Sequence, residues 1–253
     1  MAAENGAHAA GGHSPLTQFE IHELVPIHIG DLNLSFTNSG LWMAIAVVLS
    51  TLLFTTGMRR GAMVPGRVQS LAELTYQFVA NMVRDNVGNE GRPYFPFIFT
   101  LFVFILFGNM LGMVPYSFTF TSHIIVTFSM ALVVFIGVTI IGFVRHGVGF
   151  LSYFVPKGVP VGLLVVLVPI EVLSYFVRPV SLSLRLFANM MAGHTMLKVF
   201  AGFVIALGYV AGWMPLLVIV ALTGLEIGIA FLQAYVFAVL SCLYLNDALH
   251  LHH

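Results

Sequence analysis

The stretch RPVSLSLRLFANMMAGH, residues 178–194, places Arg178 and Arg185 in sequence that is apolar for long distances on both sides. Hydrophobic residues make up 59% of the 253 residues and charged residues only 8%, whereas soluble domains carry about 25% charged residues. The composition is therefore that of a membrane protein. The ten Lys and Arg balance the ten Asp and Glu, so no net charge favours nucleic acid as a partner.

Apolar stretches predict five membrane crossings, because a helix needs about 20 mostly apolar residues to span a bilayer. They are residues 38–57, 95–115, 121–144, 161–205 and 212–245. The second and third are joined around Pro115 and predict a helical hairpin. The last two are longer than an upright crossing requires, so we expect long, tilted or bent helices, with a kink at Pro179.

Residues 66–88 are too polar to cross the membrane, yet most of their apolar side chains follow the spacing of one helical face. These side chains are Val68, Leu71, Leu74, Tyr76, Phe78, Val79, Met82 and Val83. The pattern predicts an amphipathic helix at the membrane surface, with docking to a protein partner as the competing interpretation. The fold class is thus an all-α membrane protein. Residues 1–35 are predicted to form a flexible outer segment, and residues 36–253 a single membrane domain.

The basic residues outside the crossings lie on one predicted side of the membrane. They are Arg59, Arg60, Arg67, Arg84 and Arg92 between the first two crossings, and Arg145 and Lys157 between the third and fourth. By the positive-inside rule, the N-terminus is outside and the C-terminus inside. The first residues, MAAENGAHAAGGHSP, resemble neither a signal peptide nor a transit peptide. This favours a bacterial plasma (inner) membrane, with the mitochondrial inner membrane as the alternative.

The helix that contains the opening stretch carries polar residues on two opposite faces. At about 100° per residue, Arg185 shares its face with Glu171, Ser174, Arg178, Ser181 and Asn189, and the opposite face carries Ser183, His194 and Lys198. An ionised side chain at mid-membrane costs about 2.5–3.5 kcal/mol on insertion scales, so such residues normally face a cavity or a partner. A helix with two polar faces separates two aqueous spaces.

The last helix carries Glu226, Gln233 and Tyr244 on one face. If the two long helices are antiparallel, Glu226 and His194 lie at similar depth, where a carboxylate and an imidazole can exchange protons because histidine titrates near neutral pH. Arginine stays charged throughout, so Arg185 acts as a fixed positive charge. Such a charge attracts a carboxylate and blocks direct proton leakage. Since Glu171 is four turns away, we expect the partner carboxylate on another subunit.

Three segments together resemble a known family. PVSLSLRLFANMMAGH (residues 179–194), LEIGIAFLQAYVFAVLSCLYL (225–245) and FGNMLGMVPYSF (107–118) are similar to subunit a of the rotary F-type ATP synthase, the proton-conducting stator part of its membrane sector. The order of the predicted crossings agrees with that family, so the resemblance covers most of the chain after residue 35.

The resemblance implies a role for each of these residues. Arg185 matches the essential arginine that meets each carboxylate of the ring of c subunits, and Asn189 and Gln233 match residues beside it. The outer half-channel would contain His194, Glu226 and Asn109. The inner outlet would contain Glu171, Ser174, Arg178 and Ser181, with Tyr244 also on the proton path. The implied partners are the c-subunit ring, the peripheral-stalk b subunits, the rest of the complex and membrane lipids.

No cofactor or metal is expected. Cys242 lies in an apolar run, where an inert thiol is the usual interpretation. The histidines near the chain ends are scattered, and no G-x-x-x-x-G-K-[ST] loop for nucleotide binding occurs. The chain is therefore expected to be a proton-channel subunit and not an enzyme on its own.

Structural alternatives exist for the same residues. Arg185 could pair with Glu226, His194 and Glu226 could be a stabilising interhelical pair, Arg178 could extend to lipid headgroups, and Asn109 could join helices by hydrogen bonding. A proton-coupled secondary transporter is the rival function, but it predicts repeated halves, which the sequence does not contain. A purely structural scaffold does not explain polar residues on both faces of one helix.

Overall fold

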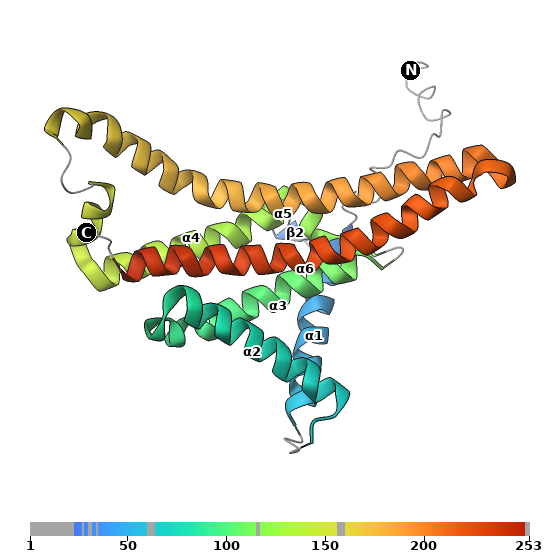
Figure 1. Ribbon diagram of the computed structural model, residues 1–253, viewed down its shortest axis with the longest axis horizontal. Helices are drawn as coiled ribbons and strands as arrows, with labels where there is room; N and C mark the ends of the chain where they lie inside the picture. Colours follow the sequence, from blue (N-terminus) through green and yellow to red (C-terminus); the bar gives the residue numbers. More distant parts are fainter. Residues whose placement is uncertain are drawn as a thin grey trace.

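The computed structural model describes residues 23–26, 28–29, 32–33, 35–59, 64–114, 117–155 and 160–250. Within them the fold is dominated by helices (Figure 1). The helices are α1 (Asn38–Met58), α2 (Arg67–Val87), α3 (Phe95–Gly112), α4 (Ile124–His146), α5 (Val161–Ala211) and α6 (Trp213–Leu249), with the 3-10 helices η2 (Asn89–Tyr94), η3 (Phe120–Ser122) and η4 (Gly147–Phe154).

Before α1, the structure contains two short antiparallel strand pairs. β1 (Glu23–Val25) pairs with β4 (Phe36–Thr37), and β2 (His28–Ile29) pairs with β3 (Leu32–Asn33). Most of the predicted outer segment, residues 1–35, lies outside the described residues, as do Pro115, Lys157 and the last three residues.

Among the described residues, five helical segments are long and apolar enough to cross a membrane. They are Asn38–Met58, Asn89–Gly112, Ile124–Phe154, Gly162–Gly208 and Trp213–Leu249. The predicted fold class, an all-α membrane protein with two long C-terminal helices and one further surface helix, is confirmed.

Helix α6 lies at the centre of the bundle, in contact with α2, α3, α4 and α5. Its fully buried residues include the small Ala230, Ala234 and Ala238, and the large Phe237. Small residues allow helix backbones in a membrane to approach one another closely, and these alanines lie in the buried core of the bundle. Helix α5 packs on α4 and α6 and forms one edge of the bundle (Figure 1).

Helix α5 continues through both of its prolines. Pro169 and Pro179 lie within it, and Gly208 is the one residue of this fully described helix with non-helical backbone angles (φ 58°, ψ −154°). A positive φ of this size is accessible to glycine at little cost. Gly208 lies just before the turn into α6, and the kink that the sequence predicts at Pro179 remains a prediction.

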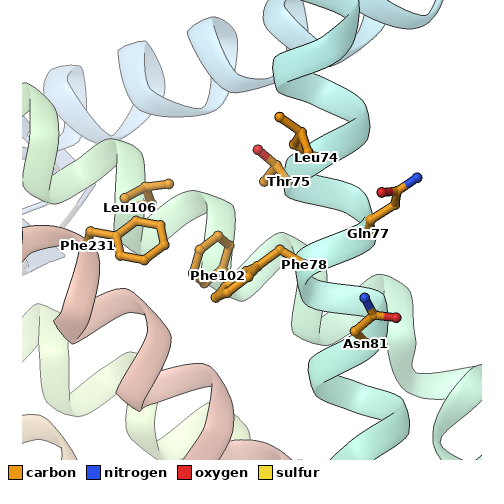
Figure 2. A pocket seen from close by; sticks show the side chains of 8 residues that line it. All are labelled: Leu74, Thr75, Gln77, Phe78, Asn81, Phe102, Leu106 and Phe231. Atoms are coloured by element: carbon orange, nitrogen blue, oxygen red, sulfur yellow. The ribbon is translucent and has the colours of Figure 1, made fainter.

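The amphipathic helix α2 uses only part of its apolar face inside the protein. Val79, Met82 and Val83 are buried in the core, whereas Leu71 and Leu74 are more than half exposed. Figure 2 shows the ring of Phe78, from α2, pointing toward Phe102 of α3 and Phe231 of α6. The second half of α2 is therefore fixed to the bundle, and its first half leaves apolar side chains uncovered.

The connection between α3 and α4 is longer than the join around Pro115 that the sequence predicted. Helix α3 ends at Gly112 and α4 begins at Ile124, and the described part of the intervening segment is largely buried, including Thr119, Phe120 and Thr121. Its hydroxyl groups satisfy backbone carbonyls, as where Ser117 Oγ donates to the carbonyl of Leu111 at 2.6 Å. The segment folds into the bundle because glycines on α3 make room for it.

Gly108 provides part of this room. A Cβ atom at this position would overlap the buried ring of Phe120. We predict that Gly108→Ala lowers the free energy of unfolding by about 1–3 kcal/mol, the usual cost of overpacking a core, measured by thermal denaturation in detergent. Gly137→Ala is the matched control, since a Cβ there meets nothing within 4 Å and alanine is the better helix former. Equal melting temperatures for Gly108→Ala and the unsubstituted protein would contradict this packing.

Candidate functional site

The two polar faces of α5 differ in burial. His194 and Ser183 are buried against the bundle, at 8% and 1% exposure, whereas Arg185 and Ser181 are exposed on the other side. Because α5 lies at the edge of the bundle, one face meets α4 and α6 and the opposite face meets whatever surrounds the protein. The structure therefore separates His194 and Ser183 from Arg185 and Ser181. Arg178 and Asn189, which helical periodicity predicts on the Arg185 face, instead contact α6.

The antiparallel packing of α5 on α6 brings three polar residues of each helix together in register. His194 faces Glu226, Asn189 faces Gln233, and Arg178 faces Tyr244. Decreasing residue numbers along α5 thus pair with increasing residue numbers along α6. The predicted common face of Glu226, Gln233 and Tyr244 is the face that α6 presents to α5.

His194 and Glu226 form a buried pair. Nδ1 of His194 lies 3.0 Å from Oε1 of Glu226, and Glu226 is only 3% exposed. The opposite ring nitrogen, Nε2, lies 3.1 Å from the hydroxyl of Thr119, in the segment between α3 and η3. The imidazole is thus held between a carboxyl group and a hydroxyl group. Among the described residues, the ion pair of Glu226 is with His194, and none joins Glu226 to Arg185.

Buried polar atoms surround this pair. Asn109 of α3 is fully buried, and its amide donates to the carbonyl of Ala230 on α6 at 3.2 Å. Buried atoms without a hydrogen-bond partner among the described residues include Oδ1 of Asn109, Oγ1 of Thr121, both carboxyl oxygens of Glu226 and Nε2 of Gln233. Such groups cost about 1–3 kcal/mol each when they stay unsatisfied. The interior beside His194 therefore has unused hydrogen-bonding capacity.

Arg185 has a different environment. In the part of the chain that the structure describes, no carboxylate lies within 4.0 Å of its guanidinium, because the four ion pairs there involve other residues. One helical turn further on, Asn189 donates to Oε1 of Gln233 at 3.0 Å. The arginine thus carries an uncompensated positive charge on the open face of α5, beside a fixed amide pair.

Arg178 is held inside the protein. Its guanidinium lies 3.0 Å from Oδ2 of Asp247 and donates to the hydroxyl of Tyr153 at 2.6 Å. The rings of Tyr244 and Tyr175 lie 5.1 and 5.6 Å from it, in cation–π range. Arg178 therefore joins η4, α5 and the end of α6.

The other residues predicted for the inner outlet, Glu171, Ser174 and Ser181, lie on the side of α5 that carries Arg185. Ser174 and Glu171 precede Arg178 in α5; Ser174 is exposed and Glu171 is half-buried. Together with Ser181, they place hydroxyl and carboxyl groups on the face that also carries Arg185. Among the described residues, no hydrogen bond or ion pair joins these three side chains to α6.

Sequence reasoning missed Thr119, Tyr153, Asp247 and Gly193. Asp247 had a usable signal, since an acidic residue at the end of an apolar helix needs a partner. Glycine is needed at position 193 because the Glu226 side chain lies close to the α5 backbone there: a Cβ atom would be 2.7 Å from Oε1 of Glu226. Thr119 and Tyr153 lie outside the long α-helices, where helical periodicity gives no information about contacts.

The fold and the site define a class of protein. It is a multi-pass α-helical membrane protein that holds an acid–imidazole pair in its interior and presents an arginine on the opposite face of the same helix. Both features lie in the segments whose sequence resembles subunit a of the F-type ATP synthase.

Comparison with known proteins identifies the family. A family model described as the ATP synthase A chain matches residues 40–246. The chain is 58% identical over 241 residues to the ATP synthase subunit a of Pelagibacter ubique, covering 95% of this chain and 99% of that protein. It is 59% identical over 255 residues to that of Parvibaculum lavamentivorans, with 97% and 98% covered. For Rhodospirillum rubrum the identity is 57% over 240 residues, with 95% and 100% covered. The chain belongs to the ATP synthase subunit a family.

Gly193 allows a test of the buried pair. A Cβ at this position would displace the end of a flexible side chain, the Glu226 carboxyl group, and not a backbone segment. We therefore predict that Gly193→Ala preserves folding but separates Glu226 from His194, so that passive proton flux through the membrane sector falls toward that of His194→Ala.

Gly202→Ala is the matched control for this experiment, because it lies on the same helix and a Cβ there meets nothing within 4 Å. Its flux should equal that of the unsubstituted protein. Full flux in Gly193→Ala would mean that the contact between Glu226 and His194 is not needed for conduction.

Proposed function

We propose that this member of the subunit a family is the proton-translocating stator subunit of an F-type ATP synthase, with two half-channels that lead to the c-subunit ring. The observation that carries the proposal is the division of α5. The buried pair of His194 and Glu226 lies on one face, and the exposed Arg185, without an ion pair in the described residues, lies on the other. The coupling of proton flow to ring rotation and ATP synthesis follows from this division.

The outer half-channel is proposed to pass His194, Glu226 and Asn109. The unused hydrogen-bonding capacity of Asn109, Glu226 and Thr121 supports this assignment, because buried polar groups of this kind normally bind water or another mobile partner. A carboxyl group and an imidazole in contact can exchange a proton at near-neutral pH. The proton would then pass to a carboxylate of the ring.

Arg185 is proposed to face that ring carboxylate. Its positive charge favours the ionised carboxylate after the proton has left, and it repels protons that would otherwise pass directly between the half-channels. The contact of Asn189 with Gln233 supports the neighbouring turn of α5. The exposed, mostly apolar face of α5, with Leu173, Phe176 and Val180 uncovered, suits a partner within the membrane.

The inner outlet is proposed to run along Glu171, Ser174 and Ser181. Arg178 and Tyr244 form its wall, because the ion pair of Arg178 with Asp247 fixes both. Each proton that crosses a potential of 100 mV delivers about 2.3 kcal/mol. Several protons are therefore needed for each ATP, and the number depends on the ring.

The proposed location is the plasma (inner) membrane of a bacterium, which the bacterial relatives support. The basic residues at the ends of the described crossings, among them Arg59, Arg92 and Arg145, favour an outer N-terminus and an inner C-terminus. Besides the c-subunit ring, the peripheral-stalk b subunits are proposed partners. The family assignment disfavours the rival function of a secondary transporter.

Replacement of the fixed charge tests the proposal. We predict that Arg185→Ala abolishes ATP-driven proton pumping by the reconstituted complex, since neither charge compensation nor the barrier to leakage remains. The measurement is quenching of a pH-sensitive dye in vesicles. Arg59→Ala, which removes an exposed arginine at the end of α1, is the control and should pump normally. Unchanged pumping by Arg185→Ala would refute the rotary interpretation.

A further inference from the structure

Thr119 occupies a place that sequence reasoning did not assign. It lies between α3 and η3, in the segment that folds back into the bundle, and it is only 4% exposed. Its hydroxyl oxygen lies 3.1 Å from the backbone carbonyl oxygen of Gly112 and 3.1 Å from Nε2 of His194. Thr119 therefore links the end of α3 to the ring that contacts Glu226.

The Thr119 hydroxyl cannot donate to both of these partners. A hydroxyl group has one hydrogen to donate and two lone pairs that accept. The carbonyl of Gly112 can only accept, so we assign the Thr119 hydrogen to it. The Thr119 oxygen is then the acceptor for His194, whose Nε2 must carry a hydrogen.

This arrangement limits the protonation of the buried pair. Nδ1 of His194 lies 3.0 Å from Oε1 of Glu226, close enough for one proton to be exchanged between the two atoms. Because Nε2 keeps its own hydrogen, the pair exists either as imidazolium with carboxylate or as imidazole with carboxylic acid. In both forms, the proton that is exchanged lies on the Nδ1 side.

Two glycines hold this geometry from opposite sides. A Cβ at Gly112 would lie 2.6 Å from both Oγ1 and Cγ2 of Thr119, and a Cβ at Gly193 would lie 2.7 Å from Oε1 of Glu226. Any larger residue would therefore displace one of the two groups that flank the His194 ring. The Thr119 and Glu226 side chains can therefore lie this close to the α3 and α5 backbones only because positions 112 and 193 are glycines.

We propose that Thr119 is a positioning residue for proton transfer: it holds the Nε2 hydrogen of His194, so that the ring does not relay protons between its two nitrogens. The pair instead exchanges its proton with the rest of the outer path through Glu226. Oε2 of that residue is buried and has no hydrogen-bond partner among the described residues, so it is open to a proton carrier. This inference rests on the proposed function of the pair and specifies how the pair works.

The test combines a spectroscopic and a functional readout on the assembled complex. With ¹⁵N-labelled histidine and His194→Gln to assign the signal, the spectrum should show a protonated Nε2 in the unsubstituted protein and in Thr119→Ser. Thr119→Val keeps the shape of the side chain but removes the acceptor. It should give a mixture of tautomers and slow ATP-driven pumping by about tenfold, the effect of one lost hydrogen bond.

Gly112→Ala is the second variant, because it displaces the hydroxyl of Thr119 without changing Thr119 itself. It should reproduce the Thr119→Val spectrum, and complex assembly is checked for each variant by the amount of the chain in purified complexes. An unchanged His194 spectrum in Thr119→Val, or a Thr119→Ser variant as impaired as Thr119→Val, would overturn the proposal. Failure of the proposed function is recognised separately, by normal pumping in Arg185→Ala.

Discussion

Two ionisable groups lie in the interior of this bundle only because they face one another. Nδ1 of His194 and Oε1 of Glu226 are 3.0 Å apart, and both side chains are almost fully buried. Either group alone would be costly there, since a buried charge without a partner destabilises a protein strongly. The contact in turn requires α5 and α6 to be antiparallel and close, which Gly193 permits. The register of the two long helices is the condition on which the other contacts depend.

The same register gives the two faces of α5 different roles. Its inner face is occupied by α6, whose Gln233 and Tyr244 meet Asn189 and Arg178. Its outer face is left with Arg185 and a series of large apolar side chains. A permanent charge in such a position is expensive unless a partner of opposite charge is supplied. The exposed Arg185 therefore favours a partner subunit that supplies a group of opposite charge.

The sequence predicted the parts of this arrangement that follow from length and periodicity. Apolar stretches predicted the crossings, and the 3.6-residue repeat separated Arg185 from His194. Contacts that depend on tertiary packing were not accessible in this way. Thr119 contacts His194 because a non-helical segment folds back over α3. Asp247, near the C-terminal end of α6, contacts Arg178 because α6 runs antiparallel alongside α5. The backbone of α5 leaves helical geometry at Gly208, because glycine adopts a positive φ at little cost.

In the proposed function, α5 keeps two aqueous paths apart and presents Arg185 to a carboxylate of another subunit. The most direct measurement is a cryo-electron microscopy map of the assembled membrane sector in its lipid environment. The account predicts that the Arg185 guanidinium faces a c-subunit carboxylate within about 4–6 Å, the range over which opposite charges favour each other's ionised forms, with His194 and Glu226 on the far side of α5. A map in which Arg185 faces lipid, or pairs with a carboxylate of its own chain, would contradict it.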